Sequence, residues 1–488
     1  MNTFYTNCVV RGNNLLYRGV CDDKRMSKKI PYKPTLFLPS KKQSKFTTLD
    51  NKQVESIKFD SIKEANDFIS RYEDVDNFEI YGNNSYNYVY LSDTFPDQIE
   101  IDLSKIVIAI IDIEVASNDG FPEPKTANQS VLSIALKLKY NNTERTYVYG
   151  MKDYTGTGDF KYIKCDCEQT LLQNFIRKWT DVYPDVVTGW NSNRFDFLYL
   201  INRIDKVYPN LDYKKLSPWG SVFLRERKQL DGSIEYTPEI LGVSLLDYLQ
   251  LYKKFSFTAQ ESYRLDYIGH AELGERKLNY DEYSNLGELY QKDFNKFAEY
   301  NVRDVNLVDM LEQKLNLLTQ SIQLAVDTKV NFDDVFMQVR MWDQIIYDHF
   351  RKNNLVYPFK KKNIKTAYAG AYVKDPIVGF HKWIVSLDVN SMYPNLIIQH
   401  NISPDTITGD YQKVDIQDLI NKRIDTEFLI KKNVALTANG QQFRRDKQGI
   451  LPQVVERIYK ERVKYKKLEL EKKKELELIE AEIIRRKI

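Results

Sequence analysis

Residues 106–117, IVIAIIDIEVAS, set the fold expected for the middle of this chain. Six apolar residues are followed by Asp112 and Glu114, which are separated by one position. A short, wholly apolar run is typical of a strand covered on both faces. Because residues two apart on a strand point to one face, the two carboxylates are expected side by side. Such a pair repels unless it holds cations, although acidic residues are also common where a strand emerges into solvent.

Strands and helices alternate on the C-terminal side of this run, which favours an α/β sandwich. Strand patterns are followed by helical patterns and by a run that ends in Gly189-Trp190-Asn191. The expected elements are strands at 131–138 (VLSIALKL) and 145–151 (RTYVYGM), a helix at 171–183, a strand at 185–191 and a helix at 196–208. Asp231-Gly232, within residues 223–238, is a strong signal for a β-hairpin.

The flanking regions have different patterns. Residues 1–105 alternate apolar and polar residues around the turn at 11–14, which predicts hairpins of a small β-rich domain. Ser61–Tyr72 has helical spacing, with Ser61 as the N-cap. Residues 318–360 are expected to be mostly helical. From Gln453 to Ile488 there is no Gly or Pro, which predicts one long, solvated helix.

The composition is that of a folded protein of more than one domain: 488 residues, 42% hydrophobic, 34 tyrosines and a net charge of +3. So small a net charge means that any surface for nucleic acid must be a local patch. Four cysteines in so long a chain do not make a disulfide framework. We find no signal-peptide pattern, and no apolar run approaches the ~18 residues of a membrane helix, so we expect an intracellular protein without a membrane partner.

Three further side chains fit a metal-dependent nuclease. Asp196 is expected in the first turn of a helix that follows a strand, and Tyr300 and Asp304 are four residues apart on one helix face. Each feature has a simpler explanation, because acids favour first helical turns and Tyr/Asp pairs are common on surfaces. The pattern is specific because the Asp112/Glu114 strand, the Asp196 segment and the Tyr300/Asp304 helix follow one another within one α/β unit.

Together these segments resemble the tyrosine-containing DEDD class of 3′→5′ proofreading exonucleases, which have a ribonuclease-H-like fold. The resemblance covers about residues 106–317 and implies that Asp112, Glu114, Asp196 and Asp304 hold two Mg²⁺, with Mn²⁺ as a possible substitute. It also implies that Tyr300 aligns an attacking water. Lys277 matches, more loosely, a lysine that neutralises DNA phosphate charge.

A second set of motifs follows in residues 384–398, IVSLDVNSMYPNLII. We expect an apolar strand that delivers Asp388 to its end and then breaks into a turn with Tyr393 and Pro394. Residues 367–376, AYAGAYVKDP, combine small residues with a lysine, and Arg462 and Lys466 form one cationic helix face. No Asp-x-Asp follows Asp388 in this sequence, so we expect only part of a two-metal site.

With these motifs, the whole sequence resembles the N-terminal portion of family B DNA polymerases of the T-even-type bacteriophage group. The resemblance implies that Asp388 is a metal ligand and that Tyr393 packs under the deoxyribose of an incoming nucleotide. The other implied contacts are with triphosphate, by Val389, Ser391, Arg462 and Lys466, and with DNA, by Lys277, Tyr368, Gly370 and Lys374.

The expected organisation is an α+β and α/β multidomain chain. It comprises an N-terminal domain (1–105, with 318–360 returning to it), an exonuclease domain (106–317), part of the polymerase palm (361–445) and the first fingers helix (446–488). We expect a DNA-directed DNA polymerase that is incomplete alone, with 3′→5′ exonuclease activity, acting in the cytoplasm of an infected bacterium.

The expected partners are single-stranded DNA, primer–template and dNTPs. A separate C-terminal polypeptide, as in a naturally split polymerase, would supply the remaining fingers, palm and thumb and would bring a sliding clamp. Two alternatives stay open at this point: a stand-alone exonuclease and a non-catalytic fragment that binds nucleic acid.

Overall fold

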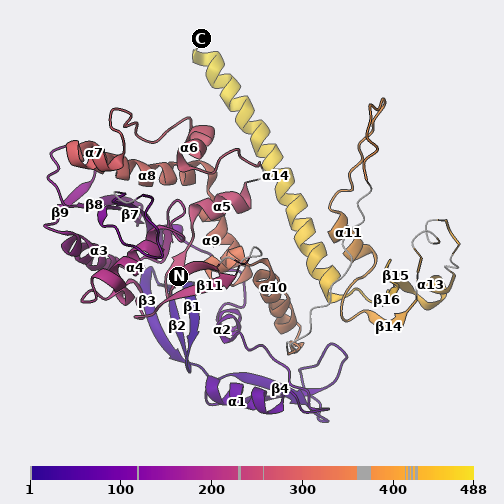
Figure 1. Ribbon diagram of the computed structural model, residues 1–488. Helices are drawn as coiled ribbons and strands as arrows, with labels where there is room; N and C mark the ends of the chain where they lie inside the picture. The colour runs from indigo at the N-terminus through magenta and orange to yellow at the C-terminus, as the bar shows by residue number, and fades with distance from the viewer. Residues whose placement is uncertain are drawn as a thin grey trace. The chain divides into compact units, whose positions relative to one another are not determined.

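The computed structural model describes residues 3–117, 120–228, 232, 234–256, 258–359, 375–412, 414–415, 418, 421–423 and 427–487. The chain forms two compact units, whose helices and strands are labelled in Figure 1. Unit 1 comprises Met1–Leu36 and Ser56–Ile345, and unit 2 comprises Phe37–Glu55 and Ile346–Ile488.

Unit 1 begins with an antiparallel sheet of β1 (Thr3–Arg11), β2 (Asn14–Cys21) and β3 (Lys24–Pro31), in that order. The hairpin predicted at residues 11–14 is confirmed. Arg11 pairs with Asn14, and Gly12 turns the chain with a φ of +57°, a left-handed conformation that glycine adopts without steric cost. This sheet is the β-rich N-terminus expected from the alternating pattern.

The helix predicted after Ser61 is also present, as α1 (Ile62–Tyr72). The hydroxyl of Ser61 accepts a hydrogen bond from the Glu64 amide at 3.1 Å, which satisfies one of the free N–H groups at the start of the helix. The short strands β4 (Thr35–Pro39) and β5 (Val54–Lys58) precede α1 in the chain, and α2 (Tyr86–Thr94) and a single 3₁₀ turn, η1 (Leu103–Lys105), follow it.

The central element of unit 1 is a six-stranded mixed sheet in the order β13–β10–β6–β7–β8–β9. Its strands are β6 (Ile108–Val115), β7 (Val131–Tyr140), β8 (Thr143–Gly150), β9 (Lys161–Lys164), β10 (Val186–Thr188) and β13 (Ser244–Leu245). β6 is parallel to β10 and antiparallel to β7. The strands and helices predicted between residues 106 and 208 therefore form one α/β unit.

Both faces of β6 are covered, as its unbroken apolar run predicts. Ala109, Ile111 and Ile113 pack in one buried core with α3 (Glu168–Val182) and α4 (Asp196–Val207). Ile110 belongs to the other core, which contains the buried side chains of α8 (Phe294–Leu315). Since side chains alternate along a strand, the even-numbered residues of β6 face α8.

Further helices and one hairpin complete unit 1. They are η2 (Tyr213–Leu216), β11 (Val222–Lys228), β12 (Ile234–Ile240), α5 (Tyr248–Phe255), α6 (Leu265–Leu273), α7 (Leu286–Lys292), α9 (Leu317–Thr328), η3 (Phe332–Phe336) and the start of α10 (Gln338–Lys352). β11 and β12 pair antiparallel from Val222–Ile240 to Lys228–Ile234, as the hairpin signal predicts. Asp231 itself lies outside the described residues, and Gly232 has a φ of +85°.

The first strand of the chain is bound to a segment more than 300 residues later. The Tyr5 hydroxyl donates to the carbonyl oxygens of Val330, at 2.7 Å, and Ala325, at 3.0 Å. The Cys8 amide donates to Asn331 Oδ1 at 2.8 Å. Tyr5 is completely buried. The N-terminal sheet is thus part of the same core as α9 rather than a separate appendage.

A buried ion network joins the N-terminal sheet to the segment before β10. Asp185 is 3% exposed and lies 2.9 Å from Arg18 Nη2 and 2.9 Å from Arg25 Nε. It also accepts hydrogen bonds from the Val107 amide at 3.0 Å and the Thr6 hydroxyl at 3.1 Å. Four donors on one carboxylate offset the cost of removing its charge from water.

Unit 2 contains a small antiparallel sheet and the helix that ends the described chain. Its elements are α11 (Met392–Gln399), β14 (Ile407–Tyr411), α13 (Glu427–Lys432), β15 (Val434–Leu436), β16 (Gln441–Arg444) and α14 (Ile450–Lys487), with the strands ordered β14–β16–β15. The long helix predicted from Gln453 is present as α14, drawn in yellow in Figure 1. Across the described residues, no helix has the length and apolarity needed to cross a membrane.

The strand and turn predicted at 384–394 are wrong in this structure. Residues 384–388 have no strand assignment, and Tyr393 and Pro394 lie in the first turn of α11, after Ser391 with a φ of +49°. Proline is tolerated there because the first-turn amides have no partner within the helix. An apolar run becomes a strand only if another strand satisfies its backbone, and no described strand pairs with these residues.

The Asp185 network predicts a large effect of a small change. We expect Asp185→Asn to lower the free energy of unfolding by about 3–5 kcal/mol, because the buried Arg18 guanidinium loses its counter-charge. The measurement is the urea unfolding curve followed by fluorescence. Asp181→Asn, at an exposed aspartate near the end of α3, is the matched control and should shift stability by less than ~0.5 kcal/mol. Equal shifts in the two variants would contradict the prediction.

Candidate active site

Asp112 and Glu114 lie on the face of β6 that is covered by α8. They continue the even-numbered series that begins with Ile108 and Ile110, so both carboxylates point to the same side of the sheet. Both side chains are half-buried. The paired carboxylates expected from the sequence are therefore placed side by side, inside the α/β unit rather than at an open strand end.

Asp196 approaches the same strand from the first turn of α4. Its Oδ1 accepts a hydrogen bond from the Ile113 amide at 2.9 Å, and the residue is only 3% exposed. The approach depends on Gly189 in the preceding loop, since a Cβ at that position would lie 2.5 Å from the Ile111 carbonyl oxygen. A strand–loop–helix connection without that side chain brings Asp196 against β6.

α8 brings Tyr300 and Asp304 to the other side of the carboxylate pair. Both are nearly buried, which excludes the simpler explanation of a surface Tyr/Asp pair. The ammonium group of Lys277 forms an ion pair with Asp304 and lies 3.3 Å from the Tyr300 hydroxyl. Lys277 thus joins the two residues that are four apart on the helix.

Three of the four predicted carboxylates form a group that suits a cation. Asp112, Glu114 and Asp304 each offer an oxygen within 4.8 Å of the others, and Asp304 Oδ1 is buried without a hydrogen-bond partner. Hard oxygen donors at this spacing fit Mg²⁺ or Mn²⁺. Asp196 is not part of this group, and its Oδ1 is bound to the Ile113 backbone.

The electrostatics of the cluster lead to the same conclusion. Burial, with Asp304 nearby, raises the pKa of Asp112 to about 8, and burial raises the pKa of Glu114, Asp196 and Asp304 above their ordinary values. Lys277 and a hydrogen bond from Asn301 oppose the shift at Asp112. Protein groups alone therefore leave these carboxylates short of positive charge at neutral pH, and bound cations would supply it.

Two buried residues of the site were not predicted. Asn301 donates to Asp112 Oδ2 at 2.7 Å, and Asp247 accepts from the Asn191 and Asn193 amides, each at 3.2 Å, which fixes the loop that leads to Asp196. The spacing of Asn301, three residues before Asp304, places the two near each other on the helix surface, but it does not reveal the partners of Asn301 on β6 and β7. The signal for Asp247 was its place as the N-cap of α5, which says nothing about the distant loop.

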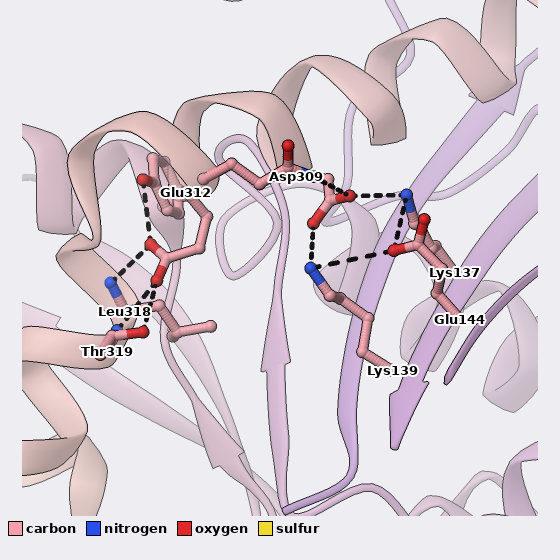
Figure 2. Close-up of polar contacts among 9 residues, drawn as sticks. Lys137, Lys139, Glu144, Asp309, Glu312, Leu318 and Thr319 are labelled. Carbon is pink, nitrogen blue, oxygen red and sulfur yellow. Dashed lines mark hydrogen bonds and ion pairs between the residues drawn. The ribbon is translucent and has the colours of Figure 1, made fainter. Parts of the chain in front are cut away.

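An ion network fixes α8 against the sheet one turn beyond Asp304 (Figure 2). Asp309, 2% exposed, lies 2.6 Å from the ammonium groups of both Lys137 and Lys139 on β7. Glu144 of β8 lies 3.3 Å from the same Lys137. A few residues along, Glu312 accepts from the Leu318 and Thr319 amides at the start of α9 (Figure 2).

The polymerase-like residues of unit 2 are arranged differently. Asp388, Val389 and Tyr393 are exposed, and among the described residues Asp388 belongs to no group of three or more acidic, His or Cys side chains close enough to share a cation. Arg462 of α14 donates to the Ser391 hydroxyl at 3.0 Å, so two of the predicted triphosphate contacts lie together.

The remaining predicted residues of this region are placed only in part. Lys466 is exposed one turn further along α14 from Arg462. The predicted DNA contacts Tyr368, Gly370 and Lys374 lie outside the described residues.

Comparison with known proteins gives the class of this chain. A model of the DNA polymerase family B exonuclease domain matches residues 64–268, and a model of DNA polymerase family B matches residues 336–482. The two ranges together take in more than half of the chain. The chain belongs to the family B DNA polymerases.

Among known proteins, the chain is similar to the DNA-directed DNA polymerases of Escherichia phage RB69 (31% identical over 493 residues) and Enterobacteria phage T4 (29% over 495 residues). Each alignment covers 96% of this chain and 54% of the relative. The DNA polymerase delta catalytic subunit of Plasmodium falciparum is 25% identical over 393 residues, which cover 75% of this chain and 34% of that protein. The chain thus spans about half the length of the curated phage relatives it matches.

The anchor of α8 generates a test with a defined pH dependence. Burial would raise the pKa of Asp309, but the hydrogen bonds from Lys137 and Lys139 outweigh it and hold the pKa below its ordinary value. A lowered pKa stabilises the fold above the unfolded-state value of about 3.9, and this stability is lost as pH falls through the folded pKa. We expect Asp309→Asn to cost about 3–5 kcal/mol at pH 7, and the difference from wild type to shrink below pH ~4.

Urea midpoints of wild type and Asp309→Asn at pH 7, 5 and 3 would check this expectation. Asp205→Asn, at an exposed aspartate on α4, is the control and should follow wild type at every pH. A gap between wild type and Asp309→Asn that stays constant down to pH 3 would show that the ionised charge of Asp309 does not stabilise the fold.

Proposed function

We propose that unit 1 is a 3′→5′ exonuclease that uses two divalent cations, Mg²⁺ or Mn²⁺, held by Asp112, Glu114, Asp196 and Asp304. The observation that carries the proposal is the group of half-buried Asp112 and Glu114 with buried Asp304, whose oxygens lie within 4.8 Å of one another. Membership of family B, with a match to its exonuclease domain, supports the same conclusion. In this proposal Asp196, whose Oδ1 is bound to the Ile113 amide of β6, serves a second cation.

The cations would supply a water of lowered pKa and stabilise the oxygens that attack and leave phosphorus. The chain's own groups then have separate tasks. The carboxylates fix where the phosphate can sit. Burial and the neighbouring Asp304 raise the pKa of Tyr300, so its hydroxyl stays protonated at neutral pH and can donate to a water or a phosphate oxygen. The ammonium of Lys277 adds positive charge beside them.

The proposed substrate is the 3′ end of single-stranded DNA. Relatives from two bacteriophages carry the name DNA-directed DNA polymerase, and proofreading of a frayed primer end fits an exonuclease domain in that family. The corresponding place of action is the cytoplasm of an infected bacterium.

The nuclease proposal predicts loss of cleavage on removal of one carboxylate. We expect the purified chain with Mg²⁺ to release mononucleotides from the 3′ end of a 5′-labelled single strand. Asp196→Asn should lower this rate by about 10²-fold or more, since several kcal/mol of stabilisation come from bound metal. Asp205→Asn, the same change at an exposed site of the same helix, should cleave like wild type.

Removal of Mg²⁺ by EDTA should stop cleavage, and added Mn²⁺ should restore it. Equal cleavage by wild type and by the double variant Asp112→Ala/Glu114→Ala would trace the activity to a contaminant and sink the proposal. Tight binding of the strand without any cleavage would instead favour the non-catalytic alternative.

We further propose that Asp388 is one metal ligand of a DNA polymerase site that is completed by residues outside this sequence. The match of residues 336–482 to the polymerase family supports this, as does the contact of Arg462 with Ser391. Large apolar side chains around Asp388 are almost fully exposed: Val378 at 94%, Trp383 at 98% and Leu387 at 91%. Exposed apolar surface of this kind is typical of a face that contacts further protein.

In this proposal, a C-terminal polypeptide supplies the other palm carboxylate, the thumb and the link to a sliding clamp. Tyr393 would contact the sugar of the incoming dNTP, and Val389, Ser391, Arg462 and Lys466 its phosphates. Tyr368, Gly370 and Lys374 would contact primer–template DNA.

Reconstitution tests this second proposal. We expect the chain alone to extend no primer, and a mixture with a polypeptide carrying the C-terminal half of a family B polymerase to extend it with dNTPs and Mg²⁺. Asp388→Asn should abolish extension by the mixture, whereas Asp410→Asn, at an exposed aspartate of β14, should not. Primer extension by a mixture with Asp388→Asn would refute Asp388 as a metal ligand. A mixture that extends no primer would refute the proposal that a C-terminal polypeptide completes the site.

A further inference from the structure

Asn301 is buried beside the carboxylate cluster and every polar atom of its side chain is bonded. It is 0% exposed and lies on α8 between Tyr300 and Asp304. Its Nδ2 donates to Asp112 Oδ2 at 2.7 Å and approaches the Asp112 carbonyl oxygen at 3.3 Å. Its Oδ1 accepts from the Ser133 hydroxyl at 2.8 Å.

The chemistry of the three partners allows one orientation of the amide. The Asp112 carbonyl oxygen can only accept hydrogen bonds, and so can its carboxylate when ionised to hold a cation, so the NH₂ group must face Asp112. The amide oxygen then faces Ser133, whose hydroxyl can donate. Ser133 is itself fully buried on β7, directly opposite Glu114 in the β6–β7 pairing. A flipped amide would place one oxygen against another and leave Ser133 without its acceptor.

We propose that Asn301 is a positioning residue that holds the Asp112 carboxylate in the orientation needed to bind a divalent cation. A single N–H occupies one lone pair of Oδ2 and leaves the other lone pairs of the carboxylate available. The inference rests on the proposed metal-dependent nuclease site, which it extends to a residue that does not itself touch a cation.

A neutral donor suits this position better than a charged one. Lys277 already provides a full positive charge beside Asp304. A second ammonium on Asp112 would compete with a cation for the same carboxylate, whereas an amide orients the carboxylate without neutralising it. Hydrogen-bond partners of this kind change metal affinity by about 10- to 100-fold when they are removed.

The test measures metal binding directly, in an Asp388→Asn background so that only unit 1 is titrated. Asn301→Ala and the uncharged Asn301→Leu, which has nearly the size of Asn, are compared by Mn²⁺ titration, with free Mn²⁺ followed by electron paramagnetic resonance. We expect both to raise the Mn²⁺ dissociation constant by about 10- to 100-fold. Asn306→Ala, the same change at a half-exposed site of the same helix, should leave it unchanged.

Kinetics separate positioning from a merely structural role. We expect Asn301→Ala to lower kcat for single-stranded DNA with little change in KM, and raised Mn²⁺ to restore kcat. Folded variants with a Mn²⁺ dissociation constant within about twofold of wild type would overturn the inference. If neither Asn301 variant folds, Ser133→Ala provides the test, because it removes the donor that orients the Asn301 amide. We expect it to raise the Mn²⁺ dissociation constant by a smaller factor, ~3 or more, and an unchanged constant would overturn the inference.

The outcomes for Asn301 and for the nuclease are distinguishable. Mn²⁺ binding that depends on Asn301 in a chain that cleaves no DNA would refute the nuclease and keep the positioning role. Metal-dependent cleavage, with Mn²⁺ binding that is unaffected by substitution of Asn301, would support the nuclease and refute the positioning role.

Discussion

Four carboxylates gathered beside β6, two of them buried and two half-buried, are the constraint to which the rest of unit 1 is adapted. Like charges that are removed from water repel strongly, so they destabilise a fold unless hydrogen-bond donors or cations surround them. The donors around this cluster come from different elements: a backbone amide of β6 for Asp196, Lys277 for Asp304, and Asn301 for Asp112. Each donor satisfies one oxygen and leaves others free, an arrangement suited to holding ions rather than to stability alone.

Such a cluster works only if the elements that carry it cannot slide. The register of α8 on the sheet is set by Asp309 between Lys137 and Lys139, about one turn beyond Asp304. The segment before β10 is fixed to the N-terminal sheet through Asp185 and two arginines. Breaking either buried network would leave uncompensated charge, so alternative packings are strongly disfavoured. Ion networks away from the site thus determine the geometry within it.

Local patterns predicted most of unit 1 because its elements follow their own periodicity. The alternation along β6 predicted that Asp112 and Glu114 share a face, and helical spacing paired Tyr300 with Asp304. Asn301 was missed because its partners, Asp112 and Ser133, come from two strands that lie far away in sequence. The strand expected before Asp388 failed for a related reason: strand formation depends on a neighbouring strand, and none of the described strands provides one.

The bonds from Tyr5 and Cys8 to residues 325–331 have a consequence for how the protein is made. A ribosome adds about 5–20 residues each second, so the first strand leaves the tunnel roughly 15 s to a minute before its partners exist. During that interval Tyr5 and the apolar face of the N-terminal sheet have no native surface to cover them. The nascent chain must therefore wait, exposed, for its own distant segment, and the length of that wait is set by translation speed and by access of chaperones.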